Sequence, residues 1–396
     1  MKIVHYSILL IITLFFSCKN KMEIDENINS PYSSYLIKHF SKKSKNVRWL
    51  LKEKDSVSNS LLFKHGNYII SVSNDPLIKK TKNVILKNPY YKEVEKDAYN
   101  SNNYPISYSV VYNNKLISLF KGGKFVCHDL LDFERDLEFE NKINTYDFQN
   151  FWLYNKKLIA LYNNEIYIWE DSVWKKSDID FPLNNSKKLY EDESFVVFKD
   201  DFGEWGGTLY FFEKKTGIIY YTLSFGAKNV YKENNKFYVT ERINDGNKIT
   251  EIENPRNLSV ANRNKMFQKV KLKFKDGNEN IGAYGYLDNS KITKEYSFFD
   301  SLNLISSFCL NEKRYFLVNV YGLTFVAELK EKGKRIEIVH PFFKNSYFSN
   351  NPTTHVQEDY IIINLDHYYS DYLREASVVL INKNEILKLD WNILHN

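Results

Sequence analysis

The sequence predicts an all-β protein, a β-propeller of about seven blades, with six to eight compatible with its repeat. Short runs of aromatic and β-branched residues, separated by turn residues, recur along most of the chain. One segment is repeated, because Tyr112–Leu119 (YNNKLISL) matches Tyr154–Leu161 (YNKKLIAL) at a spacing of 42 residues. No stretch has the period of a long amphipathic helix. Several short strands in each period of this length are typical of propeller blades.

Clusters of predicted strands follow one another from Val47 onward. Their turns carry Asn-Asn, Asn-Lys or Gly-Gly pairs, which tolerate positive φ, as at Asn113–Asn114 and Asn155–Lys156. The cluster at 270–297 has the weakest pattern, and the polar residues 256–268 before it predict a loop or a helical turn. Two β-sandwich domains are the alternative, which the repeat disfavours. The clusters span 47–86, 108–127, 151–176, 195–223, 229–252, 270–297, 305–339 and 355–389.

The pattern at 195–223 predicts a strand, a loop, a strand, a turn and a strand. The loop, Asp200–Gly207, is unusually acidic and rich in glycine. This loop is the leading candidate in the sequence for contact with a ligand. An indole ring can stack on a sugar or an aromatic group, and carboxylates could bind Ca²⁺, although the spacing is not that of an EF-hand loop. The structural alternative is that the glycines permit close packing while the acids stay solvated. The predicted ligand-binding residues are Asp200, Asp201, Glu204 and Trp205.

Two further segments have a functional and a structural interpretation. Asp366–Asp371 brings a histidine between two carboxylates, which could serve a metal or acid–base site, but a hairpin loop explains it more simply. Lys265–Lys275 alternates lysine with apolar residues, which predicts a strand with one buried and one solvated face. An anionic glycan or a lipid headgroup is the alternative partner for these lysines.

The cysteines, the net charge and the absence of catalytic motifs exclude several classes of function. We expect Cys127 and Cys309, which both lie in apolar strand patterns, to be buried free thiols, with a disulfide between them as the alternative. The net charge of +6 comes from 55 basic and 49 acidic residues, without the dense basic block of a nucleic-acid-binding protein. The sequence lacks the local motifs of serine hydrolases, zincins and nucleotide-binding enzymes. We therefore predict no catalytic residue, metal or cofactor.

The amino terminus carries an export signal. Lys2 is followed by the apolar run Ile8–Phe16, which is too short to span a bilayer, and then by Ser17 and Cys18. These residues resemble a bacterial lipoprotein signal, which implies lipidation of Cys18 and anchoring to the outer membrane or cell envelope. An ordinary secretory signal is the alternative. The resulting organisation is a signal peptide at 1–17, a lipidated cysteine and flexible tether at 18–44, and a propeller at 45–396.

Together these features predict a non-catalytic binding or scaffold lipoprotein that acts as a monomer and contacts a protein or glycan through its propeller loops. Neutralisation of a toxin at the membrane would be one form of this binding role. The alternative function is a propeller-fold glycan hydrolase or lyase. Its carboxylates would be dispersed over several blades and would therefore leave no local motif.

Overall fold

The computed structural model divides the chain into two units, Met1–Asn46 and Val47–Asn396. Every described residue lies in the second unit, so Cys18 and the predicted tether lie outside the described residues. The described residues are 61–65, 68–73, 77, 80–87, 89–90, 109–120, 122–179, 181–183, 186–243, 246–273, 279–290, 293–300, 302–320, 323–343, 352–370, 373–383 and 385–391.

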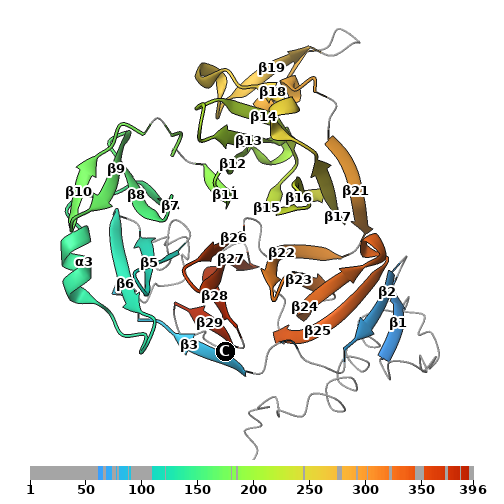
Figure 1. The fold of residues 1–396 in the computed structure, drawn as a ribbon, viewed down its shortest axis with the longest axis horizontal. Coiled ribbons are helices and arrows are strands. Elements are labelled where there is room, and N and C mark those ends of the chain that lie inside the picture. The colour runs from blue at the N-terminus through green and yellow to red at the C-terminus, as the bar shows by residue number, and fades with distance from the viewer. Residues whose placement is uncertain are drawn as a thin grey trace, which may run out of the picture. The chain divides into compact units, whose positions relative to one another are not determined.

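Within Val47–Asn396, six sheets stand around a common centre, and each follows the chain as an antiparallel meander, which is the pattern of a propeller blade (Figure 1). Six is the lowest number in the predicted range. Blade 1 is β4 (Val110–Tyr112), β5 (Lys115–Phe120) and β6 (Lys124–Asp129); blade 2 is β7 (Asn150–Tyr154), β8 (Lys157–Tyr162), β9 (Glu165–Glu170) and β10 (Val173–Lys176); blade 3 is β11 (Lys187–Glu191), β12 (Phe195–Asp201), β13 (Gly207–Glu213) and β14 (Ile219–Ser224).

The second half of the chain supplies the other three blades. Blade 4 is β15 (Ala227–Glu233), β16 (Lys236–Ile243), β17 (Gly246–Ile252) and β21 (Thr293–Asp300); blade 5 is β22 (Asn303–Leu310), β23 (Lys313–Val320), β24 (Leu323–Lys330) and β25 (Arg335–Phe343); blade 6 is β26 (Thr353–Gln357), β27 (Tyr360–Ser370), β28 (Leu373–Asn382) and β29 (Glu385–Asp390).

Six described strands lie outside the meanders, together with the helices. The strands are β1 (Leu61–His65), β2 (Tyr68–Val72), β3 (Lys80–Ile85), β18 (Ser259–Val260), β19 (Lys269–Lys273) and β20 (Glu279–Ala283). The helices are α3 (Leu137–Ile143) and the 3-10 turns η2 (Gly203–Trp205), η3 (Pro255–Asn257), η4 (Arg263–Lys265), η5 (Tyr284–Leu287) and η6 (Glu331–Gly333).

Two of the eight predicted strand clusters do not form blades. In the first, β2 pairs in parallel with β25 at the outer edge of blade 5, and β3 pairs in parallel with β29 of blade 6. The cluster at 270–297 is divided between the separate hairpin β19–β20 and β21, the fourth strand of blade 4. Both clusters have strand composition, but β2, β3 and β21 pair with strands of the blades, whereas β19 and β20 pair only with each other among the described strands.

The predicted turns are confirmed where the repeat is clearest. Asn113, Asn114, Asn155 and Lys156 all have positive φ, between 49° and 61°, so both central residues of each hairpin turn are left-handed. Two consecutive left-handed residues are the geometry of a type I′ turn, whose twist matches that of the strands that it joins. The Asn-rich pairs therefore set the strand register in blades 1 and 2.

The ring is closed where blade 6 meets blade 1. The Val111 backbone N–H donates to Gln357 Oε1 at 2.6 Å, and the Ser109 N–H donates to Asn364 Oδ1 at 2.8 Å. Apolar side chains of both blades, including Phe120 and Leu389, share one buried cluster. Closure here therefore depends on packing and on side-chain hydrogen bonds to the backbone.

The strands β11, β15, β22 and β26 lie nearest the centre (Figure 1). Blades 3 and 6 are not neighbours in the ring, yet β11 and β26 contact each other across the centre. The ring of His355 lies 3.1 Å, measured from Nε2, from the backbone oxygen of Lys188. A side chain of blade 6 therefore reaches the backbone of the opposite blade 3 across the centre of the propeller.

Candidate functional site

The four predicted ligand-binding residues lie where the sequence places them, at the connection from β12 to β13 in blade 3. Asp200 and Asp201 end β12, and Glu204 and Trp205 belong to the 3-10 turn η2. Glu204 is exposed, whereas Trp205 is half-buried. The loop thus brings the four residues together, but their side chains have different environments.

Asp200 is held by the blade itself. Its Oδ1 accepts a hydrogen bond from the Thr208 N–H at 2.7 Å, and its Oδ2 accepts one from the Tyr210 hydroxyl at 2.7 Å. Burial raises the pKa of Asp200, although these hydrogen bonds oppose the rise. Both carboxylate oxygens therefore tie the loop to β13, which is a structural role.

Asp201 shapes the loop. Its Oδ1 accepts a hydrogen bond from the Gly203 N–H at 2.9 Å, and its Oδ2 lies 3.5 Å from Lys199 Nζ. The Lys199 side chain is buried, and this burial lowers the pKa of Lys199 to about 8, although Asp201 opposes the shift. Asp201 therefore turns the chain and supplies a partner for a buried ammonium group.

Trp205 contacts a segment far away in the sequence. The Lys269 ammonium lies 5.0 Å from the centroid of the Trp205 ring and 5.9 Å from that of Phe202. This geometry is that of a cation–π contact, which is worth roughly 0.5–1 kcal/mol at exposed sites. The predicted loop and β19 therefore form one continuous surface.

This contact exists because described parts of the insertion between β17 and β21, including Tyr284 and Gly285, pack on blade 3. The Tyr284 ring stacks on Tyr221 with centroids 4.4 Å apart, and the Gly285 N–H donates to Thr208 Oγ1 at 2.9 Å. A Cβ atom added to Gly207 would lie 2.6 Å from the Asp200 oxygen, so only glycine fits at the start of β13. Close packing at this glycine agrees with the structural alternative for this loop, whereas Asp200 is not solvated as that alternative expects.

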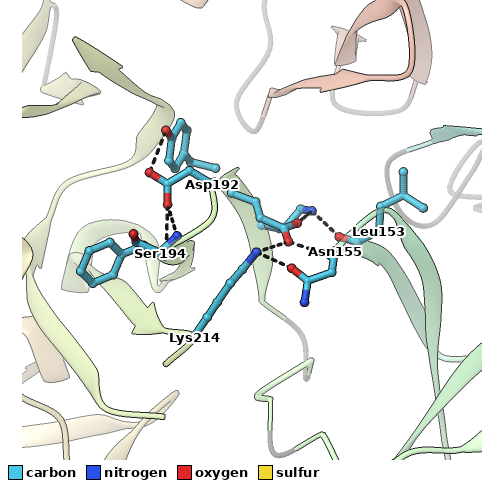
Figure 2. Close-up of polar contacts among 9 residues, drawn as sticks. Leu153, Asn155, Asp192, Ser194 and Lys214 are labelled. Carbon is cyan, nitrogen blue, oxygen red and sulfur yellow. Dashed lines mark hydrogen bonds and ion pairs between the residues drawn. The ribbon is translucent and has the colours of Figure 1, made fainter. Parts of the chain in front are cut away.

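A second polar group, which sequence reasoning missed, joins blades 2 and 3 (Figure 2). The buried Lys188 ammonium donates to the Leu153 oxygen and to Glu191 Oε2, the latter at 2.6 Å. Lys214 Nζ donates to Glu191 Oε1 at 2.7 Å and to Asn155 Oδ1 at 2.6 Å. Both Glu191 oxygens thus bind lysine, and no local spacing in the sequence indicates this long-range pairing.

The same group continues toward blade 4. Asp192 Oδ1 accepts hydrogen bonds from the Ser194 and Phe195 N–H groups (Figure 2). Its Oδ2 lies 2.9 Å from Lys232 Nζ. The turn after the first strand of blade 3 is thereby tied to the first strand of blade 4. These charged side chains link neighbouring blades, so we assign them a structural role.

The two other segments with a possible functional role, Asp366–Asp371 and Lys265–Lys275, contain strands where the structure describes them. Asp366 and His367 lie within β27, and Ser370 pairs with Leu373, so this segment is the predicted hairpin, with longer strands. Lys269–Lys273 is the predicted strand, with exposed lysines on one face. Asp371 and Lys275 lie outside the described residues.

Both cysteines are free thiols, as we predicted. Cys127 is buried, and burial raises the pKa of its thiol. Cys309, however, is exposed, so the prediction that both thiols are buried is wrong for this residue. It lies near the end of β22, where strand composition does not reveal which face meets solvent.

Among the described residues, no group of three or more histidine, cysteine or acidic side chains is placed to hold a metal ion. In the same part of the chain, none of the helices has both the length and the apolar content needed to cross a bilayer.

Comparison with known proteins gives only distant likenesses. No family model and no curated protein matches the chain. Among solved structures, the N-terminal domain of Nup159 has a TM-score of 0.36 at 9% identity, covering 80% of this chain and 89% of that one. Kluyveromyces lactis Hsv2 has a TM-score of 0.32 at 14% identity, covering 69% and 93%.

BamB from Moraxella catarrhalis has a TM-score of 0.28 at 10% identity, covering 72% of this chain and 76% of that one. At identities and TM-scores this low, these likenesses carry no argument about what the chain does. The propeller assignment therefore depends on the strand pairing described above.

Proposed function

We propose that the chain is a membrane-anchored, non-catalytic binding or scaffold protein of the bacterial cell envelope. A lipid at Cys18 would hold it, and loops of blade 3 would contact a protein or a glycan. One observation carries the binding role: the inserted hairpin β19–β20 joins the aromatic loop at Trp205, which extends blade 3 beyond the repeat. Elements added to a repeated scaffold are common places for binding.

The chemistry of the buried acids supports a non-catalytic role. Asp200 binds Thr208 and Tyr210, and Glu191 binds two lysines, so both carboxylates are held by the fold. A glycan hydrolase or lyase would instead require two carboxyl groups facing a shared substrate position. Trp205, by contrast, is half-buried and so keeps part of its ring accessible to a partner.

The anchor has a direct test. Cys18→Ser removes the thiol that would carry the acyl chains, so the protein should move from the membrane fraction to the soluble fraction of cells that express it. Immunoblotting of the two fractions measures this shift. Ser17→Ala, which keeps Cys18, is the control and should stay with the membrane. Equal partitioning of Cys18→Ser and the unaltered chain would reject the anchor.

The binding surface has a separate test. Trp205→Ala should reduce capture of an envelope partner by roughly tenfold or more, since truncated aromatic anchors typically cost this much. Quantitative cross-linking and pull-down from envelope extracts would measure the change. Tyr296→Ala is the matched control, because Tyr296 is 38% exposed and also has a lysine, Lys332, 6.0 Å from its ring centroid. Equal capture by the two variants would contradict the proposed surface.

A further inference from the structure

The hairpin β19–β20 has an edge that pairs with no other described strand. Lys269–Lys273 pairs with Glu279–Ala283 in a two-stranded sheet, and in the described part of the chain neither strand joins a blade. In an antiparallel pair, the N–H and C=O groups of each strand point alternately toward the partner strand and away from it. The edge of β19 opposite β20 therefore offers a row of backbone donors and acceptors to an additional strand.

The same strand carries a concentrated positive charge. Residues 258–273 contain no acidic residue, and five basic residues in this range are exposed: Arg263, Lys265, Lys269, Lys271 and Lys273. The neighbouring loop contributes Asp201 and Glu204, and β20 contributes Glu279, so the five cations leave an excess of positive charge on this surface. The positive charge of the hairpin therefore favours negatively charged partners.

Strand geometry places three of these lysines in a regular row. Lys269, Lys271 and Lys273 are exposed, whereas Leu272 is buried and Val270 packs against the hydrophobic core. Because alternate side chains point to the same face and the rise is about 3.3 Å per residue, successive lysine Cα atoms lie about 6.6 Å apart. An extended peptide with acidic residues at alternate positions has the same spacing.

Among the described residues, the neighbours of the row leave its middle lysine, Lys271, open to a partner. Lys273 Nζ lies 3.6 Å from Glu279, and Lys269 lies over Trp205. Lys271 lies opposite Ile281, whose side chain is 48% exposed. A partner strand on the free edge of β19 could therefore place an acidic side chain beside Lys271.

We propose that β19 binds an acidic, extended peptide segment of a partner protein, which adds to its free edge as a third strand of the hairpin. Backbone hydrogen bonds would supply affinity, and carboxylates opposite the lysine row would fix the register. The same lysines discourage pairing with neutral or basic strands, including another copy of β19, because like charges would face each other. A lipid headgroup would use the charge but not the backbone edge.

This inference rests on the proposed binding function and names its partner class. The test uses the full chain in detergent and a labelled peptide of alternating Glu and Thr residues, with fluorescence anisotropy as the readout. The unmodified peptide should bind. The same peptide with N-methyl groups on the amides that face β19 should bind at least roughly tenfold more weakly, because each methyl group removes a strand-pairing donor.

Two charge-reversal variants locate the site. Lys271→Glu should lose peptide binding by roughly tenfold or more, whereas Lys313→Glu, an exposed strand lysine in blade 5, should bind as the unaltered chain does. Equal binding of the methylated and unmodified peptides, or no effect of Lys271→Glu, would overturn the proposal. Binding of phosphatidylglycerol vesicles in preference to the peptide would also overturn it, in favour of a lipid surface.

These results can be separated from those for the proposed function. Loss of partner capture in Trp205→Ala without any peptide binding would keep the proposed function and reject the acidic strand. The opposite result is peptide binding that depends on Lys271, while Trp205→Ala leaves partner capture unchanged. That result would support β19 as a strand-binding edge and reject the role of the aromatic loop.

Discussion

Glu191→Ala should destabilise the propeller by about 3–5 kcal/mol, because it leaves a buried ammonium group without its carboxylate. Lys188 is buried, and burial lowers its pKa while Glu191 opposes the shift. Burial also acts to raise the pKa of Glu191, but Lys188 and Lys214 outweigh it and hold the pKa below its usual value. Urea unfolding monitored by circular dichroism would measure the change in the free energy of unfolding.

The control is an ion pair that lies at the surface, where loss of a carboxylate leaves no buried charge. Glu170 pairs with Lys157 at the surface, so Glu170→Ala should cost only about 0–1 kcal/mol. The double variant Lys188→Met, Glu191→Leu should recover part of the loss, since it removes the buried ammonium of Lys188 together with its carboxylate, while Lys214 keeps its hydrogen bond to Asn155 Oδ1. A loss in Glu191→Ala no larger than that in Glu170→Ala would show that the Lys188–Glu191 pair does not hold blades 2 and 3 together.

Acidification should also destabilise the fold, because three histidines are buried in their neutral form. Burial lowers the pKa of His128 and of His340 to about 4 and that of His355 to about 3, from an ordinary value of 6.5. Arg135 lowers the pKa of His128 further, and Lys188 does the same for His355. Each ring therefore resists protonation in the folded state more than in the unfolded chain.

The sign of the effect follows from proton uptake. Between pH 6.5 and about 4, the unfolded chain binds protons that the folded state does not, so the free energy of unfolding falls as the pH falls. Each histidine contributes about 1.4 kcal/mol per pH unit in this window, which gives about 4 kcal/mol per unit for all three. The stabilising contribution is complete above pH 6.5.

Urea unfolding at several pH values in this window measures the slope. His128→Phe removes one titrating group, so its slope should be shallower by about 1.4 kcal/mol per pH unit than that of the unaltered chain. The Phe side chain keeps an aromatic contact with Trp391, whose ring centroid lies 5.3 Å from that of His128. Identical slopes in the two proteins would show that His128 does not contribute to acid unfolding.

Local chemistry explains why much of the fold can be predicted. Asn113–Asn114 and Asn155–Lys156 adopt positive φ because short turns between twisted strands require it, and asparagine tolerates it better than most residues. The four predicted site residues also lie together, since they are neighbours in sequence. Their different roles could not be predicted, because the partner of Asp200 depends on pairing of β12 with β13, and the partner of Trp205 comes from the insertion.

The sequence by itself determined the strands, the turns and the propeller repeat, because alternation, β-propensity and turn residues act over a few neighbouring positions. Only the tertiary structure decided that the ring has six blades, that β2 and β3 extend blades 5 and 6, and that Lys269 lies over Trp205. Each of these depends on which distant surfaces meet. Hydrogen-bond pairing and burial between distant segments determine which surfaces meet. Neither can be inferred from a short stretch of sequence.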